Sequence, residues 1–216
     1  MPQKFENRTA AGQALAKALA SYADRPDAIV LALPRGGVPV AHEVAAALSL
    51  PMDVWIVRKL GVPGHEELAM GAIALGGACH INRDIALGLN VPERTLNQVI
   101  ARERTELARR NALYRQDRKL PSLQDKTVIV VDDGLATGAT MRAAIESLRQ
   151  AKAGYIVAAV PVGAKETCDD LRGVADDVIC LHTPEQFYGV GQWYDDFSQT
   201  SDEDVQDILS RHLAVS

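Results

Sequence analysis

Two adjacent acids and a loop of small residues follow an apolar run in this 216-residue chain. The run, residues 127–131, is short and β-branched, which is typical of a strand buried on both faces. Asp132 and Asp133 come directly after it, and the following loop, 134–140, contains two glycines and two threonines. Carboxylates accept hydrogen bonds from sugar hydroxyls or bind a divalent cation, and free N–H groups at a helix start hold a phosphate. The segment therefore predicts a site for a phosphorylated ribose and a metal ion at the carboxyl end of a strand.

Two familiar nucleotide loops do not match this segment. A P-loop ends in Gly-Lys-Ser or Gly-Lys-Thr, and residues 134–140 contain no lysine. The dinucleotide fingerprint of a Rossmann fold is also absent from it. The alternative interpretation is an ordinary strand-to-helix connection with a solvated acid pair. It would require that the acids, glycines and hydroxyls occur together by chance.

With four apolar residues, two acids and a Thr-Gly loop closed by threonine, residues 128–140 resemble a known signature. It is the motif with which type I phosphoribosyltransferases bind 5-phosphoribosyl 1-pyrophosphate (PRPP). The resemblance implies that Asp132 and Asp133 hold the ribose hydroxyls and a Mg²⁺ ion. It places the 5-phosphate on the loop formed by Ala136, Thr137, Gly138, Ala139 and Thr140. Hypoxanthine-guanine enzymes of the family carry an acid where this chain has Ala136, which argues against a 6-oxopurine acceptor.

A second apolar run, residues 28–33, ends in a loop that suits an anion. The loop is Pro34-Arg35-Gly36-Gly37, and a helical pattern follows it. A guanidinium and free N–H groups there point at one place. The loop resembles the family's pyrophosphate loop, which implies pyrophosphate binding by Arg35, Gly36 and Gly37 and a cis peptide before or after Arg35. A simple strand-to-helix turn with a surface arginine is the alternative.

A third predicted strand, residues 52–57, runs into Arg58, Lys59 and a stretch rich in glycine and proline. We expect residues 60–67 to form an irregular, mobile loop, because glycine and proline interrupt regular structure. The stretch resembles the family's catalytic flexible loop, which closes over the site and excludes water. The resemblance implies that Lys59 contacts the pyrophosphate and that Lys59, Arg58 and Arg35 act in catalysis. A solvated hairpin loop with charges is the alternative.

The rest of the chain alternates strand and helix patterns. Helices are predicted at 9–22, 92–117, 141–152, 164–173 and 202–212, and strands at 69–74, 78–82, 155–161 and 177–181. This alternation predicts an α/β protein with a mostly parallel sheet flanked by helices, and the resemblance implies the type I phosphoribosyltransferase fold.

The family adds a variable hood to this core, which binds the acceptor. We expect one domain over residues 1–216, with the core at about 25–184 and hood contributions from about 1–24 and 185–216. Phe5, Asn7 and Arg8 belong to the first hood segment. Five aromatic residues between 187 and 197 belong to the second, and they either form a platform for the acceptor or pack the hood against the core.

Composition excludes some classes of partner. The net charge of −5 and the 5% of aromatic residues argue against nucleic acid as a ligand. No apolar stretch approaches the length of a membrane span, so we expect no membrane contact. Three widely spaced cysteines form no disulfide framework, which is typical of a cytoplasmic protein. The resemblance further implies a homodimer.

The resemblance implies a reaction: transfer of ribosyl 5-phosphate from PRPP, with Mg²⁺, to a nucleobase or amine acceptor, with release of pyrophosphate. This chemistry belongs to nucleotide metabolism. Two alternatives remain open, a non-catalytic module that senses PRPP and a hydrolase of a phosphoribosyl compound. The sequence as a whole looks most like uncharacterised bacterial phosphoribosyltransferase-domain proteins, and it does not identify the acceptor.

Overall fold

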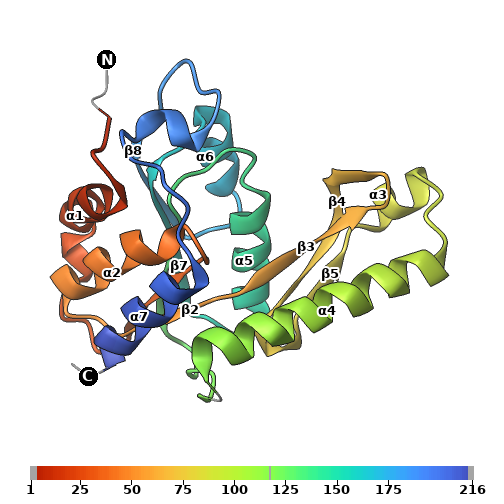
Figure 1. The fold of residues 1–216 in the computed structure, drawn as a ribbon, viewed down its shortest axis with the longest axis horizontal. Coiled ribbons are helices and arrows are strands. Elements are labelled where there is room, and N and C mark those ends of the chain that lie inside the picture. Colours follow the sequence, from red (N-terminus) through yellow and green to blue (C-terminus); the bar gives the residue numbers. More distant parts are fainter. Residues whose placement is uncertain (1–3, 117, 214–216) are drawn as a thin grey trace.

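A five-stranded parallel sheet forms the body of the protein in a computed structural model that describes residues 4–116 and 118–213 (Figure 1). Its strands, in spatial order, are β2 (Met52–Val54), β1 (Ala28–Ala32), β6 (Thr127–Val131), β7 (Tyr155–Val162) and β8 (Asp177–His182). Every residue of β1 and β6 is buried, as their unbroken apolar sequences predict. The chain places β2 on one side of β1 and places β7 and β8 on the far side of β6, so the strand order reverses between β1 and β6.

Helices cover both faces of this sheet. α2 (Gly37–Leu48) and α5 (Ala139–Gln150) lie on opposite faces (Figure 1). α1 (Arg8–Ala18) and α7 (Asp202–Leu213) pack on α2, and α6 (Lys165–Leu171) packs on β8. α5 shows why such helices form here: Met141, Ala144, Ile145 and Leu148 recur at helical spacing and are buried, while its other side is polar. The predicted α/β class with a mostly parallel sheet flanked by helices is therefore confirmed.

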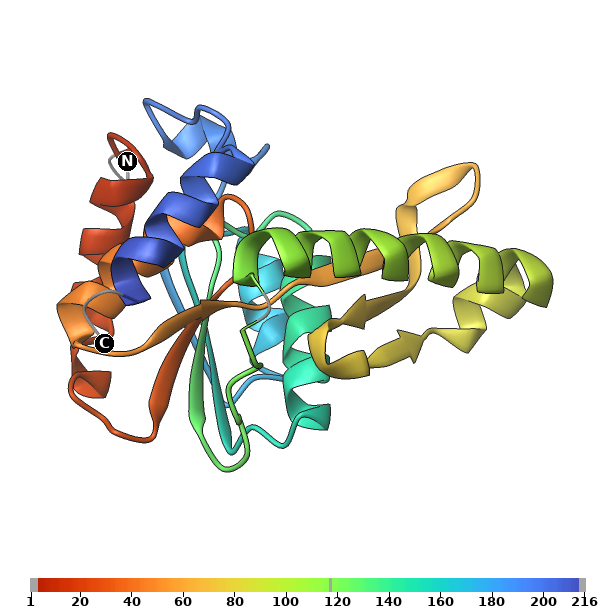
Figure 2. The same ribbon diagram turned by 60° about the horizontal axis from the view of Figure 1, so that its bottom comes forward.

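Between β2 and β6 the chain leaves the body and forms an arm, residues 57–115, which projects sideways in both views (Figure 2). Its antiparallel strands are β3 (Val57–Val62), β4 (His65–Ala74) and β5 (Cys79–Ile81). Two helices follow them, α3 (Arg83–Gly88) and α4 (Glu93–Arg115). The arm has a small core of its own, formed by Leu60, Val62, Met70, Ile73 and Val99.

The expectation of an irregular loop at 60–67 is wrong. Residues 57–62 and 65–74 pair as the β3–β4 hairpin, in which Val62 lies opposite His65. Only Pro63 and Gly64 lie outside the strands, and Gly64 has a φ of 81°, a conformation that glycine adopts without strain. The strands form because Leu60 and Val62 are buried in the arm's core, so packing overrides the glycines and proline of this stretch.

Buried polar contacts fix the root of the arm to the body. The Arg115 guanidinium at the end of α4, only 1% exposed, donates a 2.7 Å bond to Asp53 on β2 and a 2.8 Å bond to the Lys119 carbonyl. The indole of Trp55 donates a 2.8 Å bond to the Ser147 hydroxyl on α5. Within the described ranges, none of the helices is both long and apolar enough to span a bilayer.

Candidate active site

The carboxyl ends of β1 and β6 meet where the strand order reverses. Ala32 and Val131 are register partners there, and the Leu33 amide donates a 2.9 Å bond to the Val131 carbonyl. Open α/β sheets bind their ligands in the crevice at such a place. The loop at 34–37 follows β1 and the loop at 132–138 follows β6, so the topology brings together the two motifs predicted from sequence.

The two loops approach so closely that only glycine fits between them. A Cβ atom on Gly36 would overlap the carboxylate of Asp133. A Cβ on Gly37 would lie 2.6 Å from the Val131 carbonyl oxygen and 2.9 Å from the Cα of Asp132. The Pro34–Arg35 peptide is cis, as the resemblance implies. Gly36 and Gly37 therefore allow the loop at 34–37 to contact the acids of the loop at 132–138.

The acid pair is largely withdrawn from solvent. Asp132 accepts a 2.9 Å hydrogen bond from the Asp133 amide, and the Asp133 side chain is 15% exposed. Burial, and then the neighbouring charge of Asp133, raise the pKa of Asp132 well above its ordinary value. Burial also raises the pKa of Asp133, while the Arg8 guanidinium works in the opposite direction. Two carboxylates in this setting attract a cation, and Arg8 supplies one from the protein itself.

The loop after the acids leads into the N-terminus of α5. Gly138 precedes the helix with a φ of 69°, in the left-handed region. Ala136 and Thr137 are exposed, whereas the loop is fixed from behind by a 2.8 Å bond from the Thr167 hydroxyl to the Ala136 carbonyl. A fixed loop that opens onto the first turn of a helix is suited to an anion.

The three cations predicted from sequence have different surroundings. Arg35 is 32% exposed, and its Nη1 lies 3.7 Å from Asp202 Oδ1 on α7. Asp202 also accepts a 2.5 Å bond from the Tyr114 hydroxyl. Arg58 lies on β3 and donates bonds of 2.9 and 2.6 Å to one oxygen of Glu103 on α4, so this guanidinium is bound within the arm. Lys59 is half-buried on the same strand, opposite Ala72.

Residues from both ends of the chain complete the site. Phe5 donates its amide to the Trp193 carbonyl and accepts from the Asp195 amide, both at 2.9 Å. These contacts join residues 5–8 and 190–198, two stretches that lie within the expected hood contributions at 1–24 and 185–216. The name hood segments refers to these two stretches from here on. The Tyr194 hydroxyl donates a 2.6 Å bond to the Asp133 carbonyl, and burial raises the pKa of Tyr194. The sequence predicted a hood here, but it gave no signal for the contacts of Tyr194, Thr167 or Asp202, which come from elements distant in the chain.

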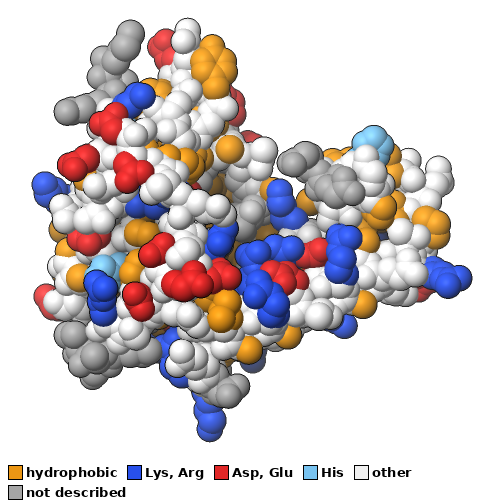
Figure 3. Space-filling view, in the orientation of Figure 1, with side chains coloured by type: hydrophobic (Ala, Val, Ile, Leu, Met, Phe, Trp, Pro, Cys, Tyr) orange, Lys and Arg blue, Asp and Glu red, His pale blue; other side chains and the backbone are white. Residues whose placement is uncertain are grey.

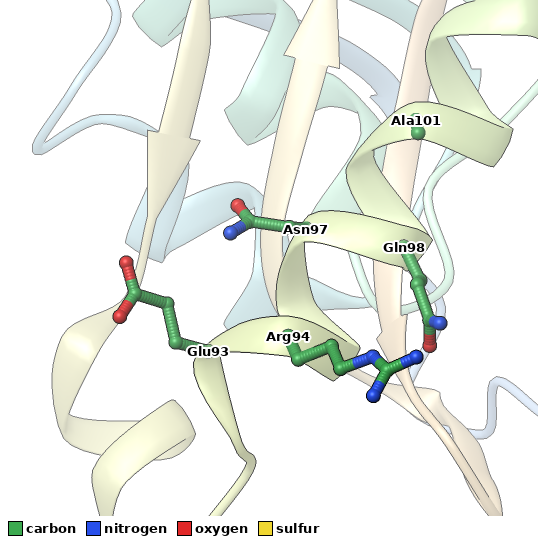
Figure 4. A pocket seen from close by; sticks show the side chains of 5 residues that line it. All are labelled: Glu93, Arg94, Asn97, Gln98 and Ala101. Carbon is green, nitrogen blue, oxygen red and sulfur yellow. The ribbon is translucent and has the colours of Figure 1, made fainter.

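Acidic side chains gather over α7 in Figure 3, beside basic ones over the adjacent part of α4, and the surface is hollowed between body and arm. A cavity of about 870 Å³ opens beside the hood. Its lining includes His182, Glu185, Gln186, Gln192 and Trp193. Another hollow, of about 560 Å³, lies on the first half of α4 and holds none of the predicted site residues (Figure 4).

Comparison with known proteins places this architecture in a family. The profile of a family described as "Phosphoribosyl transferase domain" matches residues 4–197. A protein of Mycobacterium tuberculosis, provisionally named a phosphoribosyl transferase, is 44% identical over 207 residues, which are 96% of this chain and 46% of that protein. The chain therefore spans about half the length of this relative.

Solved structures agree on the fold. The crystal structure of TT1426 from Thermus thermophilus superposes with a TM-score of 0.85 at 39% identity, over 97% of this chain and 99% of the other. AQ2163 from Aquifex aeolicus shares the fold at a TM-score of 0.52 and 12% identity, over 94% of this chain and 84% of that one. The fold is that of an α/β protein in which the two predicted loops meet where the order of the parallel strands reverses. The chain belongs to the phosphoribosyl transferase domain family.

Proposed function

We propose that the protein is a phosphoribosyltransferase that binds PRPP with Mg²⁺. It transfers ribosyl 5-phosphate to a nucleobase or amine and releases pyrophosphate. The observation that carries this proposal is the contact between the two predicted loops, where Gly36 lies against the Asp133 carboxylate. In this proposal, residues 136–140, the acid pair and the arginine loop surround one crevice and bind the 5-phosphate, the ribose and the pyrophosphate, respectively.

Each group has a role in this proposal. Asp132 and Asp133 accept hydrogen bonds from the ribose hydroxyls. Residues 136–140 hold the 5-phosphate with their amides and hydroxyls. Arg35, Gly36 and Gly37 bind the pyrophosphate, and Lys59 offsets the charge that develops as it leaves.

Mg²⁺ fits this site when the ligand shares in holding it. The described residues include no cluster of three or more His, Cys, Asp or Glu side chains that could hold a metal ion. Asp132 and Asp133 would therefore supply part of the coordination, and ligand oxygens the remainder. When bound, the ion offsets negative charge on the phosphates.

The acceptor belongs with the hood in this proposal. The cavity of about 870 Å³ beside β8 and the hood segments is large enough for a nucleobase, and its amide, imidazole and indole groups offer both donors and acceptors. We also propose one domain over residues 1–216 with the core and hood bounds given above, a homodimer, and a cytoplasmic location. Arg58 is bound by Glu103 of the same chain. In a homodimer, Lys59 would therefore be the residue that extends to the site of the other subunit.

A two-stage experiment tests the function. PRPP with Mg²⁺ should raise the melting temperature by mass action, and ribose 5-phosphate should do so to a smaller extent. A panel of nucleobases and small amines is then screened for pyrophosphate release. Binding without turnover on any acceptor would favour the PRPP-sensing module, and release without acceptor would favour the hydrolase. The absence of a thermal shift at millimolar PRPP would contradict the proposal.

A further inference from the structure

Arg8, the first residue of α1, reaches the acid pair from outside the sequence motif. Its Nε and Nη2 donate bonds of 2.9 and 2.8 Å to the same oxygen of Asp133, Oδ2. The two side chains are only 11% and 15% exposed. Removing one partner of so buried an ion pair is strongly destabilising, because the other charge is left buried without compensation.

The same guanidinium is bound to the hood. Its Nη1 donates a 2.7 Å bond to the Ser198 carbonyl, and its central carbon lies 4.1 Å from the centre of the Phe197 ring. One planar group therefore meets a carboxylate, a carbonyl and an aromatic face, a combination for which arginine is suited and lysine is not. A displacement of residues 197–198 would therefore shift Arg8 and, through its bonds to Asp133, the carboxylate of that residue.

Asp133 is held by other parts of the chain as well. The Tyr194 hydroxyl binds its carbonyl at 2.6 Å, and the backbone of Gly36 lies against its carboxylate. Arg8 uses only Oδ2, so Oδ1 is not occupied by this pair. The orientation of Oδ1 is consequently set by an arginine 125 residues away in sequence.

We propose that Arg8 is a positioning residue for ribose: it orients the Asp133 carboxylate toward the ribose hydroxyls and couples this acid to the hood segments. The inference rests on the proposed function of the crevice and adds a residue that the family motif does not contain. Arg8 acts on the ribose end of the ligand alone, since the pyrophosphate end belongs to residues 34–37.

Arg25 offers a control for the loss of a paired arginine. It donates bonds of 3.1 and 2.6 Å to the two oxygens of Asp27, and its guanidinium carbon lies 5.9 Å from the centre of the Tyr22 ring. This pair is more exposed than that of Arg8, at 41% and 46%. Asp27 directly precedes β1, so this pair lies at the amino end of the strand, opposite the candidate site. Arg25→Ala removes a paired arginine without touching the crevice.

The test measures affinities for ribose 5-phosphate and, separately, for pyrophosphate, each with Mg²⁺, by titration calorimetry. Arg8→Ala should weaken ribose 5-phosphate binding by roughly 10-fold or more, the scale of a misplaced charge-assisted bond. Pyrophosphate binding should change less than about twofold, and Arg25→Ala should leave both affinities unchanged. Arg8→Lys, which keeps the charge but loses the planar fork, should fall between Arg8→Ala and the parent.

The outcomes separate this inference from the function on which it rests. If the parent binds neither ligand, the proposed function fails, and the ribose role of Arg8 fails with it. If the parent binds both and Arg8→Ala binds ribose 5-phosphate equally well, the positioning role alone is overturned. An equal loss of both affinities would mean that Arg8 merely supports the fold. Should Arg8→Ala not fold, the affinities of Arg8→Lys for ribose 5-phosphate and pyrophosphate provide the same test.

Discussion

The candidate site has two ends, for which we propose ribose and pyrophosphate as ligands, and they are built differently. At the ribose end, Asp133 is bound by a largely buried arginine at 2.8 Å, by Tyr194 and by close backbone packing. At the pyrophosphate end, Arg35 is 32% exposed and lies 3.7 Å from Asp202. Lys59 lies farther out, on the first strand of the arm. The difference indicates that the acids are fixed before a ligand arrives, whereas Arg35 can exchange its partner Asp202 for a ligand.

Removing the charge of the acids tests the fixed end and should have the largest effect. Asp132→Asn with Asp133→Asn keeps the shape but removes two charge-assisted bonds, each of which contributes about 1.5–3 kcal/mol. PRPP affinity should fall by at least about 100-fold in calorimetry. Circular dichroism should show an intact fold. Unchanged affinity in a folded double variant would place the ribose elsewhere.

Removing Lys59 tests whether the proposed pyrophosphate end acts during the reaction. Lys59→Ala should reduce turnover by roughly two orders of magnitude, the effect of losing one charge-stabilising donor. PRPP affinity should stay within a few-fold, because an interaction made mainly in the transition state contributes little to binding. Initial rates and calorimetry on the same preparation measure both quantities. An equal fall in affinity and turnover would instead indicate a ground-state contact.

Arg35 should behave in the opposite way. Its loop is anchored between β1 and α2, so the side chain meets the ligand in the ground state. Arg35→Ala should weaken PRPP binding by about 10-fold, the effect of one charge-assisted bond. Pyrophosphate affinity should fall by the same factor, while ribose 5-phosphate affinity should not change. A loss confined to ribose 5-phosphate would reverse the assignment of the two ends.

Releasing Arg35 from Asp202 should give a small gain in PRPP affinity. The Arg35–Asp202 pair is partly exposed, and such pairs contribute about 0–1 kcal/mol. Asp202→Asn should therefore tighten PRPP binding by at most about fivefold. Glu203→Gln, on the neighbouring residue, makes the same change in net charge and should have no comparable effect. Weaker binding in Asp202→Asn alone would show that Asp202 orients Arg35 for the ligand.

The smallest effect concerns pH and stability. A carboxyl whose pKa is raised in the folded protein stabilises the fold at low pH, and this stability is lost as pH rises through the folded value. The raised pKa of Asp132 thus predicts that the melting temperature declines as pH rises above the ordinary carboxyl range. Asp132→Asn should make this decline shallower, which melting temperatures recorded over a series of pH values would measure. Parallel curves for parent and variant would show that Asp132 is not the group responsible.

The sequence predicted the acid loop and the arginine loop because each signal is local. An apolar run, two acids and a glycine loop are contiguous, and the reversal of strand order then brings the two loops together. The strand residues at 58–62 and 65–68 were missed because Gly61, Pro63 and Gly64 indicate a loop, whereas the strand at 69–74 was predicted. The burial of Leu60, which favours the strand, depends on packing against α4. α3 was missed because six residues carry little periodicity. The contact between Arg8 and Asp133 joins residues 125 apart, a separation that no local pattern records.

The pairing of Phe5 with Tyr194 has a consequence for the order of folding. Residues 5–8 and 190–198 meet over the site, so the loop closed by this contact contains all the described strands, β1 to β8. Closing so long a loop carries an entropic cost that grows with its length, and contacts of this range form late. On the ribosome, the sheet and both site loops are complete before residues 190–198 emerge. The two site loops should therefore be in place before the contact between Phe5 and Tyr194 covers them.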